Sequence, residues 1–335
     1  MKIHTKRKNR MNPSTDNLSS FSRFPACLQK KSGWVQFFET RRTLEPHLHQ
    51  IEPTNQCLYS CIMCPRAKNM NRNVGFMEFA LYTKVIDEVA TYSEPVRSQE
   101  IELFHFGESL LHPDIEKMVG YASQRKLRVT LSVNGPQLDP EIAGKLLCVG
   151  PYRLIVSLDG NDQESYAAIR GRNADFKRAI QNIDGLITIH KKMNSKTRIS
   201  VRMIEMHLNA QHVNGFRDRW AKKDIEVDVR EFFPWSEKKM IRLGKFEKYP
   251  PFMPCPFPWK HLVVQWNGDV VPCCRDYNGA IKLGNVHNTS LKAIWNSSTY
   301  EDFRQQMASG KFKQNTMCPE CLDIYSTGPD RYSQA

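Results

Sequence analysis

Three cysteines in the stretch CLYSCIMC have the type and spacing of metal ligands. Cys57, Cys61 and Cys64 are four and three positions apart in a chain that has ten cysteines in 335 residues. Thiolates at such short spacings can converge on one soft metal centre, and iron-sulfur clusters are held in this way. A four-iron cluster held by three cysteines would leave one iron free to bind a small molecule. The alternatives are a zinc site with a distant fourth ligand and chance clustering.

A second set of cysteines lies near the end of the chain. Cys255 and Cys273 are followed by a CxxC pair, Cys318 and Cys321. Taken alone, four cysteines that end in CxxC are more typical of a zinc ribbon than of an iron-sulfur cluster. Three other cysteines are not expected to bind metal, because they lie in the N-terminal segment, in a buried helix position and beside a candidate ligand: Cys27, Cys148 and Cys274.

Composition favours metal over disulfides for these thiols. The chain of 38.9 kDa is 40% hydrophobic, which suits one large domain or two smaller ones. It has no apolar run near the ~18 to 20 residues that a membrane span needs. Its N-terminal MKIHTKRKNR is followed by polar residues and not by the apolar core of a secretory signal. We therefore expect a cytoplasmic protein, in whose reducing surroundings disulfides are uncommon.

The net charge of +13 is concentrated at the N-terminus. The first fifty residues hold ten Lys or Arg against three Asp or Glu, which gives +7. We interpret residues 1–45 as a basic, partly disordered tail, and a nucleic-acid or membrane-surface contact is the alternative. A structural-zinc protein that binds nucleic acid would also carry positive charge, but the basic residues lack the interleaved aromatic residues of a strand-binding surface.

Short apolar runs alternate with amphipathic stretches from about residue 48. The runs predict six strands, and apolar residues spaced by three and four predict five helices between them. This alternation predicts an α/β fold with a parallel sheet and helices on its outer face, open or closed into a barrel. The predicted strands cover residues 49–53, 101–106, 127–133, 152–158, 198–204 and 225–231, and the predicted helices cover 77–92, 113–125, 139–148, 173–192 and 209–222.

The predicted strands place the first cysteine set where such folds do chemistry. Residues 57–64 follow the first strand, and α/β sheets gather their active sites in the loops at the carboxyl ends of the strands. After residue 232 the pattern changes to a proline-rich linker. Residues 261–273 then alternate around Asn-Gly-Asp, which predicts a hairpin, and residues 290–308 predict a helix before the final CxxC pair.

The order of these motifs resembles the radical S-adenosylmethionine (SAM) superfamily, whose signature is a CxxxCxxC loop after the first strand of a partial (β/α)6 barrel. HFGESLLHP is similar to that family's GGEPLLHP element, and by this match Gly107 and Glu108 hold the methionine amino group of the cofactor. SVNG resembles the family's TNG turn. SLDGNDQESYAAIRG resembles its SxDG and RG stretch, which makes Ser157 and Arg170 candidates for binding the ribose or carboxylate. The alternative is that Asp159 and Gly160 form a turn and that Arg170 makes a surface ion pair.

The C-terminal part resembles the SPASM/twitch extension of the same superfamily, which carries auxiliary [4Fe-4S] clusters. This resemblance implies one fully ligated auxiliary cluster held by Cys255, Cys273, Cys318 and Cys321, beside the SAM-binding cluster held by Cys57, Cys61 and Cys64. The expected domains are the tail over residues 1–45, a radical SAM core over 46–232 and the SPASM/twitch domain over 233–330.

The resemblance also implies a reaction class. Such enzymes cleave S-adenosylmethionine to a 5′-deoxyadenosyl radical that takes hydrogen from the substrate, with electrons from a donor such as flavodoxin or ferredoxin. A fully ligated auxiliary cluster favours electron acceptance, and therefore oxidation of an alcohol carbon in a sugar-like or aminocyclitol-like small molecule. The alternative is a maturase that modifies a ribosomally made peptide. The sequence does not single out a catalytic base.

Overall fold

The computed structural model describes residues 31–171, 173–223, 225–235, 243–244, 254–315 and 317–321. One sheet of nine strands runs through these residues, in the order β6-β5-β4-β3-β2-β1-β7-β8-β9. The first six strands pair in parallel with their neighbours, as predicted. The strands are β1 His47–Ile51, β2 Glu100–Glu102, β3 Arg128–Asn134, β4 Arg153–Ser157, β5 Arg198–Glu205, β6 Glu226–Glu231, β7 His261–Val264, β8 Asp269–Val271 and β9 Gly284–Asn285.

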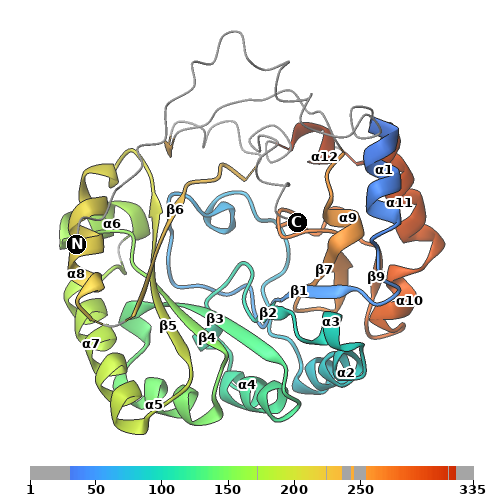
Figure 1. The fold of residues 1–335 in the computed structure, drawn as a ribbon. Helices are drawn as coiled ribbons and strands as arrows, with labels where there is room; N and C mark the ends of the chain where they lie inside the picture. The colour runs from blue at the N-terminus through green and yellow to red at the C-terminus, as the bar shows by residue number, and fades with distance from the viewer. Residues whose placement is uncertain are drawn as a thin grey trace, which may run out of the picture.

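Helices lie on the outer side of this curved sheet, and the segment between β1 and α2 lies inside the curve (Figure 1). The predicted core helices are present, with α6 as a further helix between β4 and α7. None of the helices in the described ranges has the length and apolar character required to cross a bilayer. The helices are α1 Lys31–Glu39, α2 Phe79–Ala90, α3 Glu94–Arg97, α4 Ile115–Gln124, α5 Pro140–Val149, α6 Gln163–Arg170, α7 Phe176–Met193, α8 Val213–Ala221, α9 Phe257–Lys260, α10 Leu291–Trp295, α11 Ser298–Ser309 and α12 Met317–Glu320.

The core strands have one apolar and one polar face. In β3, Val129, Leu131 and Val133 are buried in the main core, while Thr130 and Ser132 alternate with them. Since successive side chains of a strand point to opposite faces, the polar set lies on the concave side of the sheet. Parallel sheets are usually apolar on both faces. A polar concave face is therefore suited to a binding site.

The C-terminal extension continues the same sheet. β7 pairs in parallel with β1, and β8 and β9 follow as antiparallel strands. The predicted hairpin is thus present as β7 and β8, with Gly268 at φ +81° in its turn, a conformation that favours glycine. This pairing places the chain from residue 261 onward directly beside the strand that leads into the first cysteine set.

The structure corrects three details of the sequence interpretation. Residues 31–39, expected to lie in the tail, form α1, whose Trp34 and Phe38 are buried in the main core; residues 1–30 lie outside the described residues. The single helix expected over 290–308 is divided, because the Ser297 side chain accepts a hydrogen bond from the Tyr300 N–H and starts a new helix. Cys148 is exposed on α5 and not buried.

Candidate functional site

The first cysteine set lies in what we call the cysteine loop, residues 52–78 between β1 and α2. Its three thiols are close enough to influence one another: Cys57 and Cys61 both add to the raised pKa of Cys64. Burial is the main cause, and it raises the pKa of Cys57 to about 11 and that of Cys64 to about 12. Burial also raises the pKa of Cys61, which the neighbouring Arg170 opposes. The structure therefore brings the three predicted ligands together.

Arg66 braces the cysteine loop from within. Its Nη2 donates hydrogen bonds to the carbonyl oxygens of Cys57 (2.9 Å) and Tyr59 (3.0 Å). These bonds fix the backbone on both sides of Leu58. The positive charge also favours the thiolate forms of Cys57 and Cys64, the forms that bind metal.

Gly107 allows the segment after β2 to touch the start of the cysteine loop. A Cβ atom at this position would lie 2.1 Å from the carbonyl oxygen of Thr54, far inside van der Waals contact. The neighbouring Glu108 N–H donates to the Gln56 carbonyl oxygen at 2.8 Å. Gly107 is thus needed for close backbone approach, which is a structural reason for glycine at this position.

Glu108 is a buried carboxylate held by two neighbouring segments. One of its oxygens accepts from the Leu110 N–H (3.1 Å), and the other accepts from the backbone N–H (2.8 Å) and the side-chain amide of Asn134. Burial raises the pKa of Glu108 to about 7, although these hydrogen bonds oppose the shift. The carboxyl group can therefore change its protonation state near neutral pH.

Arg170 extends this network from the end of α6. Its guanidinium donates to the side-chain oxygen of Asn134 and forms an ion pair with Asp159. Both charged side chains are buried, so the alternative interpretation of Arg170 as part of a surface ion pair is wrong. Asp159 also accepts a hydrogen bond from the Ile204 N–H (2.7 Å) and therefore does more than form a turn. The Glu108-Asn134-Arg170-Asp159 network joins the ends of β3, β4 and β5 beside Cys61.

Ser157 lies at the end of β4, where it pairs in register with Asn134 of β3. Its hydroxyl oxygen is 3.4 Å from that of Ser132. Ser132 and Ser157 both lie on the concave face of the sheet, next to the Glu108-Asn134-Arg170-Asp159 network. The hydroxyl group of Ser157 contacts Ser132 and not a member of that network.

The second cysteine set is also gathered by the fold. Burial raises the pKa of Cys273 well above its ordinary value, and the thiols of Cys274, Cys318, Cys255 and Cys321 each raise it further. The four predicted ligands therefore converge around Cys273. Cys274, which was not expected to be a ligand, lies near them as well.

Glu52 connects the cysteine loop to the C-terminal extension. Its fully buried carboxylate accepts two hydrogen bonds from Arg72, whose Nε donates to the Tyr277 carbonyl oxygen at 2.6 Å. His105 lies 3.4 Å from the same carboxylate and 3.0 Å from the Cys274 carbonyl oxygen. Burial alone would raise the pKa of Glu52, but the neighbouring His105 and the hydrogen bonds from Arg72 lower it to about 2.

Sequence reasoning missed these connecting residues. Glu52 and Arg72 belong to no motif, and His105 is the first residue of the quoted HFGESLLHP stretch, of which only Gly107 and Glu108 were singled out. Asn134 and Asp159 lie inside the quoted SVNG and SLDG stretches, so the signal was present, but their partners become visible only in three dimensions.

The donor sets fit iron-sulfur clusters. Three neighbouring thiols lie in one loop, and four converge in the extension, which matches the cysteine ligation of such clusters. The first set has Glu108 and Arg170 within its electrostatic reach.

Two family models match the chain. The model of the radical SAM superfamily matches residues 51–201, and the SPASM model, described as an iron-sulfur cluster-binding domain, matches residues 255–322. The two matches contain all seven predicted cysteine ligands.

Several characterised proteins resemble the chain at low identity. An AdoMet-dependent heme synthase of Methanosarcina barkeri is 32% identical over 163 residues, 49% of this chain and 45% of that protein. A SAM-dependent 2-deoxy-scyllo-inosamine dehydrogenase of Niallia circulans is 22% identical over 84% of this chain and 95% of its own. The subtilosin biosynthesis protein AlbA of Bacillus subtilis is 24% identical over 81% of this chain and 64% of its own.

Solved structures share the fold. BtrN in complex with AdoMet and 2-DOIA has a TM-score of 0.54 at 18% identity, over 84% of this chain and 97% of BtrN. Streptococcus suis SuiB bound to the precursor peptide SuiA has a TM-score of 0.63 at 13% identity, over 98% of this chain and 80% of SuiB.

Proposed function

Because this chain belongs to the radical SAM superfamily and carries a C-terminal SPASM iron-sulfur cluster-binding domain, we propose that it removes two electrons from an alcohol carbon of a sugar-like or aminocyclitol-like metabolite. The radical SAM and SPASM matches imply that the chain binds S-adenosylmethionine and two [4Fe-4S] clusters. The substrate class and the individual ligands are our proposals.

The proposed ligands are Cys57, Cys61 and Cys64 for the SAM-binding cluster, and Cys255, Cys273, Cys318 and Cys321 for the auxiliary cluster. When bound, these cofactors would supply a hydrogen-abstracting radical and an acceptor for the second electron. Glu108, placed by the close approach at Gly107, would accept a hydrogen bond from the cofactor's amino group. Arg170 would hold Asn134, and through it Glu108, in position.

The observation that carries the oxidation proposal is the complete thiol set around Cys273. Four cysteines can ligate every iron of a four-iron cluster and leave no position for substrate. This arrangement suits an electron acceptor. The similarity to the Niallia circulans dehydrogenase, which extends over most of both chains, adds support.

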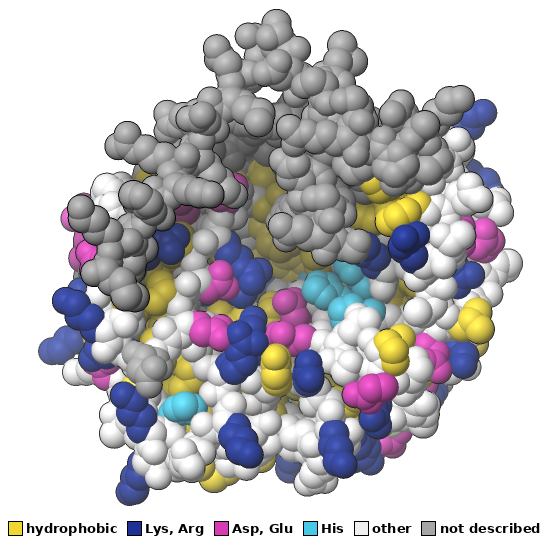
Figure 2. Space-filling view, in the orientation of Figure 1, with side chains coloured by type: hydrophobic (Ala, Val, Ile, Leu, Met, Phe, Trp, Pro, Cys, Tyr) yellow, Lys and Arg dark blue, Asp and Glu magenta, His cyan; other side chains and the backbone are white. Residues whose placement is uncertain are grey.

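The concave face of the sheet supports a small polar substrate. Glu102 of β2 and Arg202 of β5 influence each other electrostatically, although two strands separate them in the sheet. Side chains on strands so far apart can interact only across the hollow that the curved sheet encloses. Gln50 donates to Glu102, and Arg202 pairs with Asp228 at 2.8 Å. Figure 2 shows acidic, basic and histidine side chains gathered in the hollowed centre of this face. Such groups can hydrogen-bond to the hydroxyl and amino groups of a polyol.

The experiment is a substrate survey with anaerobically reconstituted, reduced protein. S-adenosylmethionine and a panel of polyols and aminocyclitols, including 2-deoxy-scyllo-inosamine, are supplied, and 5′-deoxyadenosine and ketone are measured. We expect equal amounts of both with at least one alcohol. Cofactor cleavage without oxidation of any alcohol would remove the support for this substrate class.

A peptide substrate is the second candidate. AlbA, named for bacteriocin biosynthesis, is similar over most of this chain, and SuiB was solved with a precursor peptide. Saturable binding of a precursor peptide encoded beside this gene, followed by a mass change that requires S-adenosylmethionine, would favour this function. In either case we propose a flavodoxin or ferredoxin as electron donor and a cytoplasmic location.

A further inference from the structure

Three histidines meet where the core joins the C-terminal extension. The pairing of β1 with β7 places His47 directly opposite His261. The register then shifts between Leu48 and Gln50, so that His49 is an additional residue on β1. One potential ligand atom of each histidine lies within 4.8 Å of those of the other two. A strand register and a bulge, and not a contiguous motif, therefore assemble the cluster.

His261 has an unsatisfied ring nitrogen in this cluster. The residue is only 8% exposed, and among the described residues its Nε2 has no hydrogen-bond partner. A buried polar atom without a partner is energetically costly and is uncommon in folded proteins. Its ring stacks on His49, with centroids 4.6 Å apart. This buried, unpaired nitrogen points to a ligand that the histidines share.

The other two rings have the outer contacts of metal-binding histidines. Nε2 of His47 lies 3.0 Å from the Glu100 carbonyl oxygen, so a proton there would leave Nδ1 free as a ligand. Nε2 of His49 lies 3.8 Å from a carboxylate oxygen of Glu102. Histidines that bind metal usually direct their second nitrogen to a carbonyl or carboxylate, which fixes the ring and increases its basicity.

We propose that His47, His49 and His261 form a zinc site that is separate from the two iron-sulfur clusters. Three imidazoles are a known zinc ligand set, with Zn–N distances of ~2.0 to 2.1 Å in a tetrahedral arrangement. Ligand nitrogens in such a site are ~3.4 Å apart, by simple geometry from these bond lengths. The three ligand nitrogens now lie within 4.8 Å of one another, so the rings would rotate to close around the ion. The site uses no cysteine, so zinc binding there can be tested apart from the proposed oxidation reaction.

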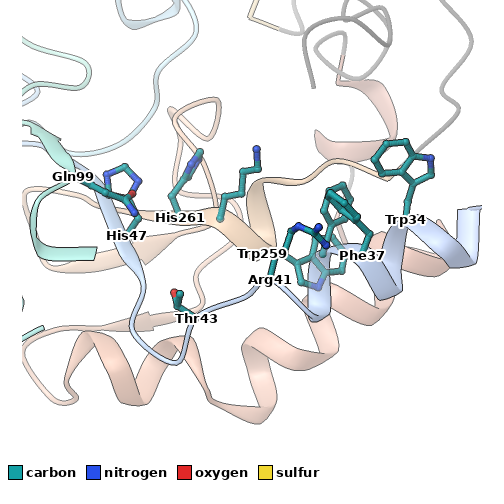
Figure 3. A pocket seen from close by; sticks show the side chains of 10 residues that line it. Trp34, Phe37, Arg41, Thr43, His47, Gln99, Trp259 and His261 are labelled. Atoms are coloured by element: carbon teal, nitrogen blue, oxygen red, sulfur yellow. The ribbon is translucent and has the colours of Figure 1, made fainter. Parts of the chain in front are cut away.

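An adjoining cavity gives this site an open coordination position. His47 and His261 line a cavity of about 340 Å³ together with aromatic residues of α1 and α9. Figure 3 shows these two histidines on one side of the cavity and Trp34 and Phe37 on the other. Arg41 and Lys260 also line it. A fourth zinc ligand would therefore be water or an anionic group, such as a carboxylate, that enters between these cations.

The test separates this zinc from zinc bound by cysteines. Protein with both clusters intact is dialysed anaerobically against zinc, its zinc content is measured, and X-ray absorption at the zinc edge identifies the ligand atoms. We expect about one zinc per chain with only nitrogen or oxygen neighbours near ~2.0 Å and no sulfur near ~2.3 Å. Absence of bound zinc, or sulfur in the first coordination shell, would overturn the proposal.

Matched variants assign the ligands. His49→Gln and His261→Gln should each reduce zinc binding by at least tenfold, whereas His287→Gln, a change at an exposed histidine outside the cluster, should leave it unchanged. Unaltered iron content and thermal unfolding would show that the variants are folded. If a variant does not fold, X-ray absorption at the cobalt edge of cobalt-loaded wild-type protein decides, since nitrogen or oxygen neighbours alone support the three-histidine site and sulfur neighbours contradict it. Equal zinc binding by the three variants would contradict the assignment.

Discussion

Arg72 holds the buried carboxylate of Glu52 through two hydrogen bonds of 2.7 and 2.8 Å, and the same guanidinium reaches the backbone of Tyr277. Two residues thus connect the loop of the first cysteine set to the extension that carries the second. The parallel pairing of β1 with β7 reinforces this connection. The two cluster-binding regions are therefore parts of one continuous structure.

Removal of Arg72 should destabilise the protein strongly. Arg72→Gln would leave the Glu52 carboxylate buried without its cationic partner, at a cost of about 3 to 5 kcal/mol in the free energy of unfolding. Arg97→Gln is the control, because the Arg97-Glu94 pair is exposed and such pairs contribute less than about 1 kcal/mol. Anaerobic chemical denaturation of cluster-loaded protein measures both. Similar losses in the two variants would mean that Glu52 tolerates an unpaired charge.

Gly107→Ala should disrupt the first cluster selectively. The added Cβ would displace the backbone at Thr54, which leads into the cysteine loop, so iron content should fall from two clusters toward one. Gly144→Ala is the matched control: its Cβ meets no atom within 4 Å, and alanine is favoured over glycine in the helix. Iron and sulfide analysis after anaerobic reconstitution checks both. Two full clusters in the Gly107 variant would show that this close approach is dispensable.

Binding of S-adenosylmethionine should become tighter with rising pH through the ionisation of Glu108. The carboxyl group has a pKa of about 7, so it is mostly protonated at pH 6 and mostly ionised at pH 8. The ionised form is the better hydrogen-bond acceptor for an amino group, so affinity should rise by up to about tenfold over this range. The Glu108→Gln variant is the control, because it removes the ionisation of Glu108 and leaves any titration of the cofactor unchanged. Equal pH dependence in wild type and variant would exclude Glu108 as the responsible group.

Arg170→Lys should weaken cofactor binding although the charge is kept. Lysine lacks the planar fork that allows Arg170 to contact Asn134 and Asp159 at once. Binding of S-adenosylmethionine should fall by about one to two orders of magnitude, since a lost hydrogen bond to a charged group costs about 1.5 to 3 kcal/mol. Isothermal titration at full cluster occupancy measures this loss. Unchanged affinity would assign Arg170 a purely structural role.

Trp34→Ala should show that α1 is part of the folded domain. Trp34 is 3% exposed and packs against Phe38, so its truncation should cost about 3 to 5 kcal/mol. Leu44→Ala, at a position that is 68% exposed, should change the free energy of unfolding by less than about 0.5 kcal/mol. Thermal unfolding compares the two. Equal stability would indicate that α1 is only loosely attached.

The sequence predicted the repeating part of the fold well, because each core strand and helix has its own apolar period. The α1 helix was missed because it is only nine residues long, follows the polar N-terminal residues, and has only Trp34 and Phe38 buried among its described side chains. The grouping of the cysteines into two sets of candidate metal ligands could be predicted from their spacing. Glu52, Arg72 and the three-histidine cluster could not, because Arg72 meets Glu52 across the cysteine loop, and a strand register and a bulge bring the histidines together. Neither feature has a local sequence signal.

The most direct test of the proposed oxidation is the ratio of ketone to 5′-deoxyadenosine, measured in wild type and in a Cys318→Ala/Cys321→Ala variant that retains the first cysteine set. With an accepted alcohol, wild type should form the two products in equal amounts. The variant should still form deoxyadenosine but almost no ketone, because it lacks the acceptor for the second electron. An unchanged ratio in the variant would contradict the account.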